Sequence, residues 1–330
     1  MAVRLTESRL PANFTAADLG QAATATDGRC VLVSFIPSPL VVGRPNSYVL
    51  FVTDAALVAA AQTYEWTFRE GDHPPVVQSS DEGETTYQPV HAGPLTLTVR
   101  VLGAGNAEQA SVALAQASVA PNATLEQQIA AASQQPGPGL GNPGVARELI
   151  NDHNAYYQAA ATQFAAGDEQ FGCFLFSTVY DGALRQPADR RRQHVQQLAA
   201  SLNNSLGNFA ELAAEATGTC GIRLFLLAMS LGAAPPVPWT EIPETPAARP
   251  PVEAQLRTRI NALDPTVKVD LFNLLRFPKS NIFQCARLLV ALRDRYFAGA
   301  SFNDVISGMS GTRAVWITRH LREGPILRNP

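Results

Sequence analysis

Three residues of this chain could together form the site of a cysteine hydrolase. Cys173 would be the nucleophile, and His153 or His194 would be the base that takes the thiol proton. Such enzymes need little more than a thiolate beside an imidazole. Cys173 lies in the apolar segment Gly172-Cys173-Phe174-Leu175-Phe176, however, and apolar surroundings raise a thiol pKa rather than lower it. The setting therefore favours a core cysteine, with the catalytic arrangement as the alternative.

Two carboxylates, Glu148 and Asp152, are spaced so that they would share one face of a helix. With His153 and Asn154 beside them they could bind a cation. Acidic residues at this spacing also occur on ordinary solvated helix faces, and the sequence shows no third or fourth ligand. A solvated face is the favoured interpretation.

A second group of carboxylates falls between candidate strands, where some β-sandwich modules bind calcium. The group consists of Glu65, Glu70, Asp72, Asp81, Glu82 and Glu84. These ligands are too scattered along the chain to specify one site. We expect them to form a solubilising surface.

No metal and no cofactor is predicted. The four cysteines have neither Cys-x-x-Cys nor Cys/His ligand spacing, so a zinc site is not indicated and we expect buried free thiols. The glycine-rich stretch Gly137–Gly144 lacks the preceding strand and the lysine of a phosphate-binding loop.

Arg190-Arg191-Arg192, with Arg185 just upstream, forms the most concentrated cationic cluster. It would begin a helix, where positive charge opposes the helix dipole, so a compensating contact is expected. Asp189 is the nearest candidate, and an ion pair within the protein or with a protein partner is the preferred interpretation over phosphate binding.

Composition limits the classes of function. The chain has 330 residues, is 46% hydrophobic and carries a formal net charge of −3, which favours two domains and gives no case for nucleic-acid binding. Lys268 and Lys279 are the only lysines, an arginine bias typical of a GC-rich bacterial genome. No signal peptide and no run of membrane-spanning length is visible, so we expect a cytoplasmic protein.

The N-terminal third alternates between apolar and polar residues with a period of two. In Tyr64–Phe68 and again in Leu95–Val101, every second residue is aromatic or aliphatic, as in half-buried antiparallel strands. The strands are expected at Cys30–Ile36, Ser47–Thr53, Gln62–Arg69, Thr85–Gln88, Leu95–Leu102 and Ala110–Ser118. Short strands with Gly/Pro turns predict a β-sandwich over residues 25–120, preceded by an arm of residues 1–24.

Two segments of this region resemble the PKD domain, an immunoglobulin-like β-sandwich. They are Trp66-Thr67-Phe68-Arg69-Glu70-Gly71-Asp72 and, after Tyr87, the run Ala92–Val99. The family shows Trp-Asp-Phe-Gly-Asp-Gly and Pro-Gly-Thr-Tyr-x-Val-x-Leu-x-Val at these places. The chain departs from that pattern at Thr67, Arg69, Glu70 and Leu95. Cys30 has no cysteine partner in the Leu95–Val101 strand, which excludes an inter-sheet disulfide.

The pattern changes after the predicted sandwich. Residues 121–144 hold a short helix at Leu125–Ala132 and then a Pro/Gly-rich linker. From residue 145 to 330 apolar residues recur at helical spacing, which predicts a multi-helix domain of no recognised family. Gly221–Leu231 is the expected central helix, Asp264 and Ser280 are expected N-caps, and the proline-rich stretch 232–251 is expected to be non-helical.

The expected function is non-enzymatic. The PKD resemblance implies an interaction module, so we expect a structural or adaptor protein that binds protein partners. PKD-like modules usually belong to exported or surface proteins, and a component or cargo of a phage-tail-like bacterial particle would reconcile this with the absent signal, through non-classical export or particle-mediated delivery. The alternative is an effector hydrolase with a targeting sandwich and a catalytic helical domain.

Overall fold

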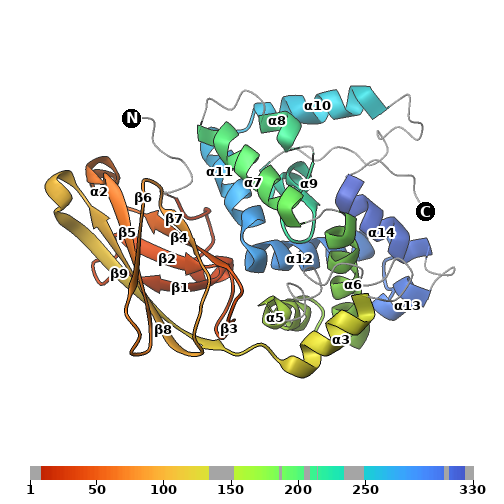
Figure 1. Cartoon of the computed structure of the whole chain (residues 1–330). Coiled ribbons are helices and arrows are strands. Elements are labelled where there is room, and N and C mark those ends of the chain that lie inside the picture. The colour runs from red at the N-terminus through yellow and green to blue at the C-terminus, as the bar shows by residue number, and fades with distance from the viewer. Residues whose placement is uncertain are drawn as a thin grey trace. The chain divides into compact units, whose positions relative to one another are not determined.

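The structure, a computed structural model, describes residues 9–133, 152–185, 188–203, 209–213, 215–233, 249–307 and 312–323. It divides into two compact units, Met1–His153 and Asn154–Pro330 (Figure 1). The first contains two multi-stranded sheets, and the second is mainly helical, as the sequence predicts for a β plus α protein. Most of the predicted linker, residues 134–144, lies outside the described residues.

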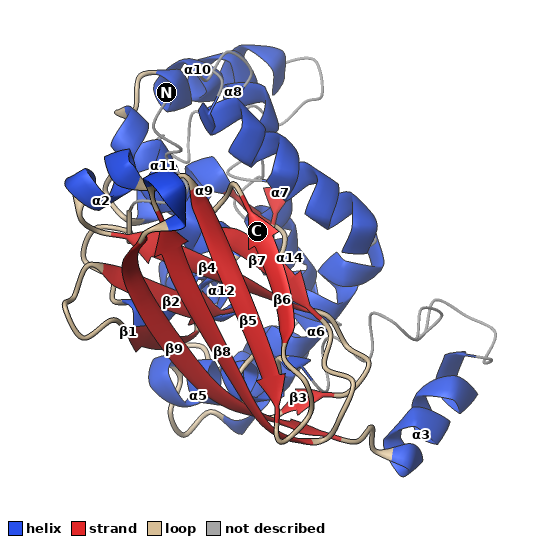
Figure 2. Cartoon of the chain, turned by 60° about the vertical axis from the view of Figure 1, so that its left-hand side comes forward, coloured by secondary structure: helices blue, strands red, loops and turns tan. Residues whose placement is uncertain are grey.

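The elements of the β unit follow one another with short connections. In chain order they are α1 (Ala16–Leu19), β1 (Gln21–Thr24), β2 (Cys30–Ser34), β3 (Leu40–Val41), β4 (Asn46–Val52), α2 (Ala55–Ala60), β5 (Thr63–Glu70), β6 (Val76–Ser80), β7 (Glu84–Tyr87), β8 (Gly93–Leu102), η1 (Ala104–Asn106), β9 (Glu108–Val119) and α3 (Ala123–Ser133). The strands form a four-stranded sheet of order β1-β2-β4-β7 and a five-stranded sheet of order β3-β9-β8-β5-β6 (Figure 2).

The two sheets share one hydrophobic core. Trp66 is fully buried at its centre, and the rings of Phe68 and Tyr87, from different sheets, stack with centroids 3.9 Å apart. On β5 the residues Tyr64, Trp66 and Phe68 are buried while Glu65 and Thr67 are not, so the predicted alternation is confirmed. Full burial of one such aromatic side chain contributes about 1.5–3 kcal/mol.

The region predicted as an N-terminal arm contributes elements to the fold. Within residues 1–24, α1 and β1 form, and β1 pairs antiparallel with β2 from Gln21↔Ser34 to Thr24↔Val31. The Gln21 side chain also donates to the carbonyl of Ala115 on β9 (3.2 Å), which ties the edge of one sheet to the other sheet. The contact with Ala115 joins residues that are 94 positions apart, so the local sequence pattern of the arm did not reveal it.

The second unit is built from helices and one two-stranded hairpin. Its elements are α5 (Asn154–Phe164), α6 (Glu169–Arg185), α7 (Ala188–Asn203), α8 (Phe209–Leu212), β10 (Ala216–Thr217), β11 (Ile222–Arg223), α9 (Leu224–Ser230), α10 (Arg249–Asn261), α11 (Pro265–Arg276), α12 (Pro278–Tyr296), α13 (Phe302–Ser307) and α14 (Thr312–Glu323). None of the helices within the described ranges has the length and apolar content that crossing a membrane would require.

Several predicted helix features change in the structure. The expected central helix opens as strand β11, and α9 beyond it is buried, but it is α12 that contacts α5, α6, α11 and α14. Asp264 caps α11 as predicted, because its Oδ1 accepts from the N–H of Thr266 at 2.7 Å. Ser280 is not a cap: Pro278 occupies the first turn of α12 and restricts Phe277 to an extended conformation, so the helix begins earlier. α10 also begins within the proline-rich stretch, at Arg249.

A single amide organises the centre of the helical unit. Asn281 on α12 is fully buried, and its Oδ1 accepts from the N–H of Cys220 at 2.7 Å. Its Nδ2 donates to the carbonyls of Leu275 (2.8 Å) and Thr217 (3.3 Å). One side chain thus satisfies three buried backbone groups and joins the β10–β11 hairpin to the α11–α12 junction.

Candidate interaction surface

A buried carboxylate fixes one end of the β unit. Glu70, the last residue of β5, is 5% exposed and accepts three hydrogen bonds. Its Oε1 accepts from Tyr87 Oη and from the N–H of Val90, both at 2.8 Å, and its Oε2 accepts from the N–H of His91 at 2.7 Å. Burial, together with the bond to Glu70, raises the pKa of the Tyr87 phenol. Glu70 therefore holds the β7–β8 connection against the end of β5.

Two histidines join neighbouring loops at the same end. The rings of His73, in the β5–β6 loop, and His91, in the β7–β8 loop, stack with centroids 3.7 Å apart and an interplanar angle of 11°. The Ser118 hydroxyl, near the end of β9, donates to the carbonyl of His91 at 2.6 Å. The nitrogen lone pairs of two stacked rings lie in separate, nearly parallel planes, so they do not converge on one metal ion. The stacked rings join the β5–β6 loop to the β7–β8 loop.

Four valines in the described part of the β unit have exposed side chains. Val76 and Val77 begin β6, Val90 precedes His91, and Val119 ends β9, with exposed fractions of 43%, 55%, 63% and 41%. Val76 and Val77 do not share one surface, because consecutive residues of a strand face opposite sides of the sheet. Val90 and Val119 are the chain neighbours of His91 and Ser118, which are joined by a hydrogen bond, and we call Val90 and Val119 the valine surface. The other large apolar side chain that is exposed in the described part of the chain is Val315, on α14. Clustered exposed apolar residues mark interaction sites more often than scattered ones do.

The predicted calcium ligands are divided among different roles. Glu65 forms an ion pair with Arg100, in which Arg100 Nε lies 2.9 Å from Glu65 Oε1. The carboxylate of Glu70 already accepts three hydrogen bonds within the β unit. The remaining members are exposed, namely Asp72, Asp81, Glu82 and Glu84. Across the residues that the structure describes, no three His, Cys, Asp or Glu side chains gather as a metal site would require.

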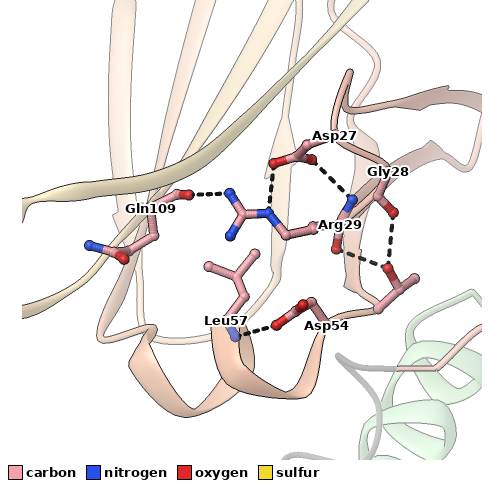
Figure 3. Close-up of polar contacts among 7 residues, drawn as sticks. Asp27, Gly28, Arg29, Asp54, Leu57 and Gln109 are labelled. Atoms are coloured by element: carbon pink, nitrogen blue, oxygen red, sulfur yellow. Dashed lines mark hydrogen bonds and ion pairs between the residues drawn. The ribbon is translucent and has the colours of Figure 1, made fainter.

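A polar cluster stabilises the opposite end of the β unit. Figure 3 shows the Arg29 guanidinium between Asp27, whose Oδ2 lies 2.7 Å from Nε, and the carbonyl of Gln109, 2.7 Å from Nη2. The backbone N–H of Arg29, and then its guanidinium, hold the pKa of Asp27 below its ordinary value. Asp54 caps α2 through the N–H of Leu57 at 2.8 Å. These contacts connect turns, and the sequence patterns did not indicate them.

The predicted catalytic residues have separate surroundings. Cys173 is exposed on α6, contrary to the expected core cysteine. His194 on α7 is 6% exposed, with Nε2 3.2 Å from Thr217 Oγ1 and Nδ1 3.6 Å from Glu215 Oε2. His153 is buried at the end of the first unit. No hydrogen bond joins Cys173 to a histidine in the described ranges.

The His194 cluster resembles a hydroxyl–imidazole–carboxylate relay only in composition. Thr217 is fully buried, and its hydroxyl also lies 3.3 Å from the carbonyl of Glu215, which competes with His194 for the hydroxyl proton. A nucleophilic hydroxyl would direct that proton at the imidazole and would face substrate. The cluster is therefore suited to fixing the β10–β11 hairpin against α7.

The exposure of Cys173 leads to a simple prediction. Of the four thiols, Cys30, Cys220 and Cys285 are buried, and burial raises the pKa of the Cys30 thiol to about 11. In native protein we expect one thiol to react rapidly with a disulfide reagent and the other three to react only on unfolding. Titration of released thiolate before and after denaturant measures this. Cys173→Ser should abolish the rapid phase, and a rapid phase that persists in that variant would contradict the assignment.

The other predicted site residues are placed as follows. Asp152 is 6% exposed, and its Oδ2 lies 2.6 Å from Arg44 Nη2, so that carboxylate already has a cationic partner. Arg191 is buried on α7. Glu148 and the side chains of Arg185, Arg190 and Arg192 lie outside the described residues.

A shallow cleft lies in the helical unit. It is lined by Ala210, Ala213, Arg223, Phe225, Leu256, Arg257 and Ile260 and has an empty volume of about 270 Å³ that is open to solvent. Sites for small molecules usually enclose about 300–1,000 Å³. The cleft suits a single apolar side chain of a protein partner better than a substrate.

The chain matches no family model, no curated protein and no solved structure among those compared with it.

Proposed function

We propose that this protein is a non-enzymatic structural or adaptor protein whose β unit is a PKD/immunoglobulin-like module for protein–protein interaction. The valine surface is the observation that carries the proposal, because two exposed valines, one in the β7–β8 loop and one at the end of β9, are held together by the hydrogen bond from Ser118 to His91. Loops and strand ends on such scaffolds commonly carry recognition.

The strand arrangement supports the immunoglobulin-like part of the proposal. Constant-type immunoglobulin domains place the first, second, fourth and fifth of their strands in one sheet and the third, sixth and seventh in the other. Here β2, β4 and β7 lie in one sheet, and β5, β8 and β9 lie in the other. β6, which follows β5 in the chain, departs from this order, because it lies in the same sheet as β5. The parallel pairing of β3 with β9 adds a short edge strand to the second sheet. Membership of a larger bacterial assembly, such as a phage-tail-like particle, is part of the same proposal and rests on the PKD resemblance.

A matched pair of variants tests the proposal. Tagged full-length protein is used for native pull-down with mass spectrometry, alongside Val90→Asp on the valine surface and Val315→Asp on α14, two sites of nearly equal exposure. We expect the wild type and Val315→Asp to retain the same partner and Val90→Asp to lose it, because a carboxylate in an apolar interface is left without a partner. Purification of the wild type as a lone monomer, or identical capture by all three proteins, would argue against the proposal.

A further inference from the structure

β6 is an open strand edge. It is the last strand of the five-stranded sheet, and within the described ranges it pairs with β5 alone, from Phe68↔Val76 to Tyr64↔Ser80. β7, which follows it, is the last strand of the other sheet, and Thr85 Oγ1 donates to Gln78 Oε1 at 2.8 Å between them. The outward backbone groups of an edge strand can pair with another chain.

The opposite edge of the five-stranded sheet offers fewer backbone groups for pairing with another chain than β6 does. There the edge strand β3 has two residues, and Gln21 of β1 is bonded to β9. Natural edge strands are also blocked by lysine, proline, bulges or inward charges. The sequence of β6, Val76-Val77-Gln78-Ser79-Ser80, contains no charged residue and no proline, and its register with β5 shows no irregularity.

Exposed carboxylates flank this edge. Asp72 lies in the loop before β6, Asp81 and Glu82 lie in the turn after it, and Glu84 begins β7. Each of these side chains is exposed, and Arg69 is the exposed cation nearest to them in sequence. The edge therefore combines apolar side chains with negative charge.

We propose that β6 binds an extended cationic segment of a protein partner by strand addition. The partner's backbone would pair with β6, its apolar residues would pack beside Val77, and its lysine or arginine residues would face the flanking carboxylates. This inference rests on the proposed interaction function and specifies its partner. A second copy of this chain fits less well, because antiparallel pairing of two β6 strands would bring Asp72, before one strand, toward Asp81 and Glu82, after the other.

The test uses the full chain and a fluorescent peptide of alternating valine and lysine. Binding is followed by fluorescence anisotropy, and hydrogen exchange of the Val76–Ser80 amides reports where the peptide lies. We expect those amides to be protected by the peptide. The variant Asp81→Asn/Glu82→Gln/Glu84→Gln should weaken binding about tenfold, since it removes three exposed ion pairs. Val77→Lys should weaken it at least as much, while Val315→Lys and Glu211→Gln, both on the helical unit, should not.

Three outcomes would overturn the inference. They are equal binding of a peptide N-methylated at every backbone nitrogen, equal binding of a valine–glutamate peptide, and protection confined to amides outside β6. Thermal unfolding shows whether Val77→Lys is folded. If Val77→Lys is unfolded, the peptide affinity of the triple variant alone decides between the expected result and its failure. Loss of the natural partner from Val90→Asp but not from Val77→Lys would reject strand addition at β6 and leave the adaptor proposal standing.

Discussion

Replacing Gly218 with alanine is expected to destabilise the helical unit by about 3 kcal/mol or more. Gly218 has φ +75°, and an added Cβ would overlap the carbonyl oxygen of Leu275 and the side-chain amide of Asn281. The left-handed conformation costs a non-glycine residue about 1–2 kcal/mol, and overpacking a rigid site adds about 1–3 kcal/mol. The obstructing atoms belong to a backbone and to a bonded amide, so they cannot move aside without breaking the contacts of Asn281. Denaturant unfolding followed by circular dichroism measures the loss.

Gly299→Ala is the matched control. Gly299 has φ +82°, in the same unit, but nothing lies within 4 Å of the position where its Cβ would be. Gly299→Ala should therefore lower the free energy of unfolding only by the cost of the left-handed backbone conformation, about 1 kcal/mol. Equal losses for the two variants would show that backbone conformation, and not the contact with Asn281, determines the effect at Gly218.

Replacing Glu70 with alanine is expected to destabilise the β unit by about 3 kcal/mol. The substitution leaves the phenol of Tyr87 and the N–H groups of Val90 and His91 without their acceptor. A buried donor without a partner costs about 1–3 kcal/mol, and the two backbone groups, which lie close to solvent, recover part of this by binding water. The β7–β8 connection should also become mobile, which would appear as faster hydrogen exchange at residues 88–92.

Glu65→Ala on the same strand is the control, because Glu65 makes a partly exposed ion pair with Arg100. Such pairs contribute about 0–1 kcal/mol. In a double-mutant cycle, Tyr87→Phe should cost less in the Glu70→Ala background than in the wild type. If Glu70→Ala were no more harmful than Glu65→Ala, Glu70 would not be the residue that fixes this end of the unit.

The sequence predicted the elements whose signals are local. The alternation around Trp66 placed β5, and Asp264-Pro265 placed the start of α11, because side-chain period and capping depend on residues close together in the chain. β6 was missed: its five residues alternate weakly, and both of its faces are partly exposed. β1 was missed because its four residues, Gln21–Thr24, show no apolar alternation, and because the bond from Gln21 to Ala115 joins segments that are distant in the chain.

The candidate site was less predictable than the fold. Glu70 was grouped with the acidic surface, yet it is buried, because its environment is formed by Tyr87, Val90 and His91 from a later segment. No sequence pattern indicated the ring stack of His73 and His91, because the two loops that carry these residues meet only after the sheets form. Cys173 was placed in the core on the basis of its apolar neighbours, but those neighbours occupy other faces of α6.

The combination of a β part with a helical part follows from residue order alone, because hydrophobic period is a property of neighbouring residues. Which carboxylates are buried, which strand has an open edge and which valines are exposed became clear only from the folded chain. Those properties depend on which distant segments of the chain pair with one another, and residue types alone do not specify that pairing.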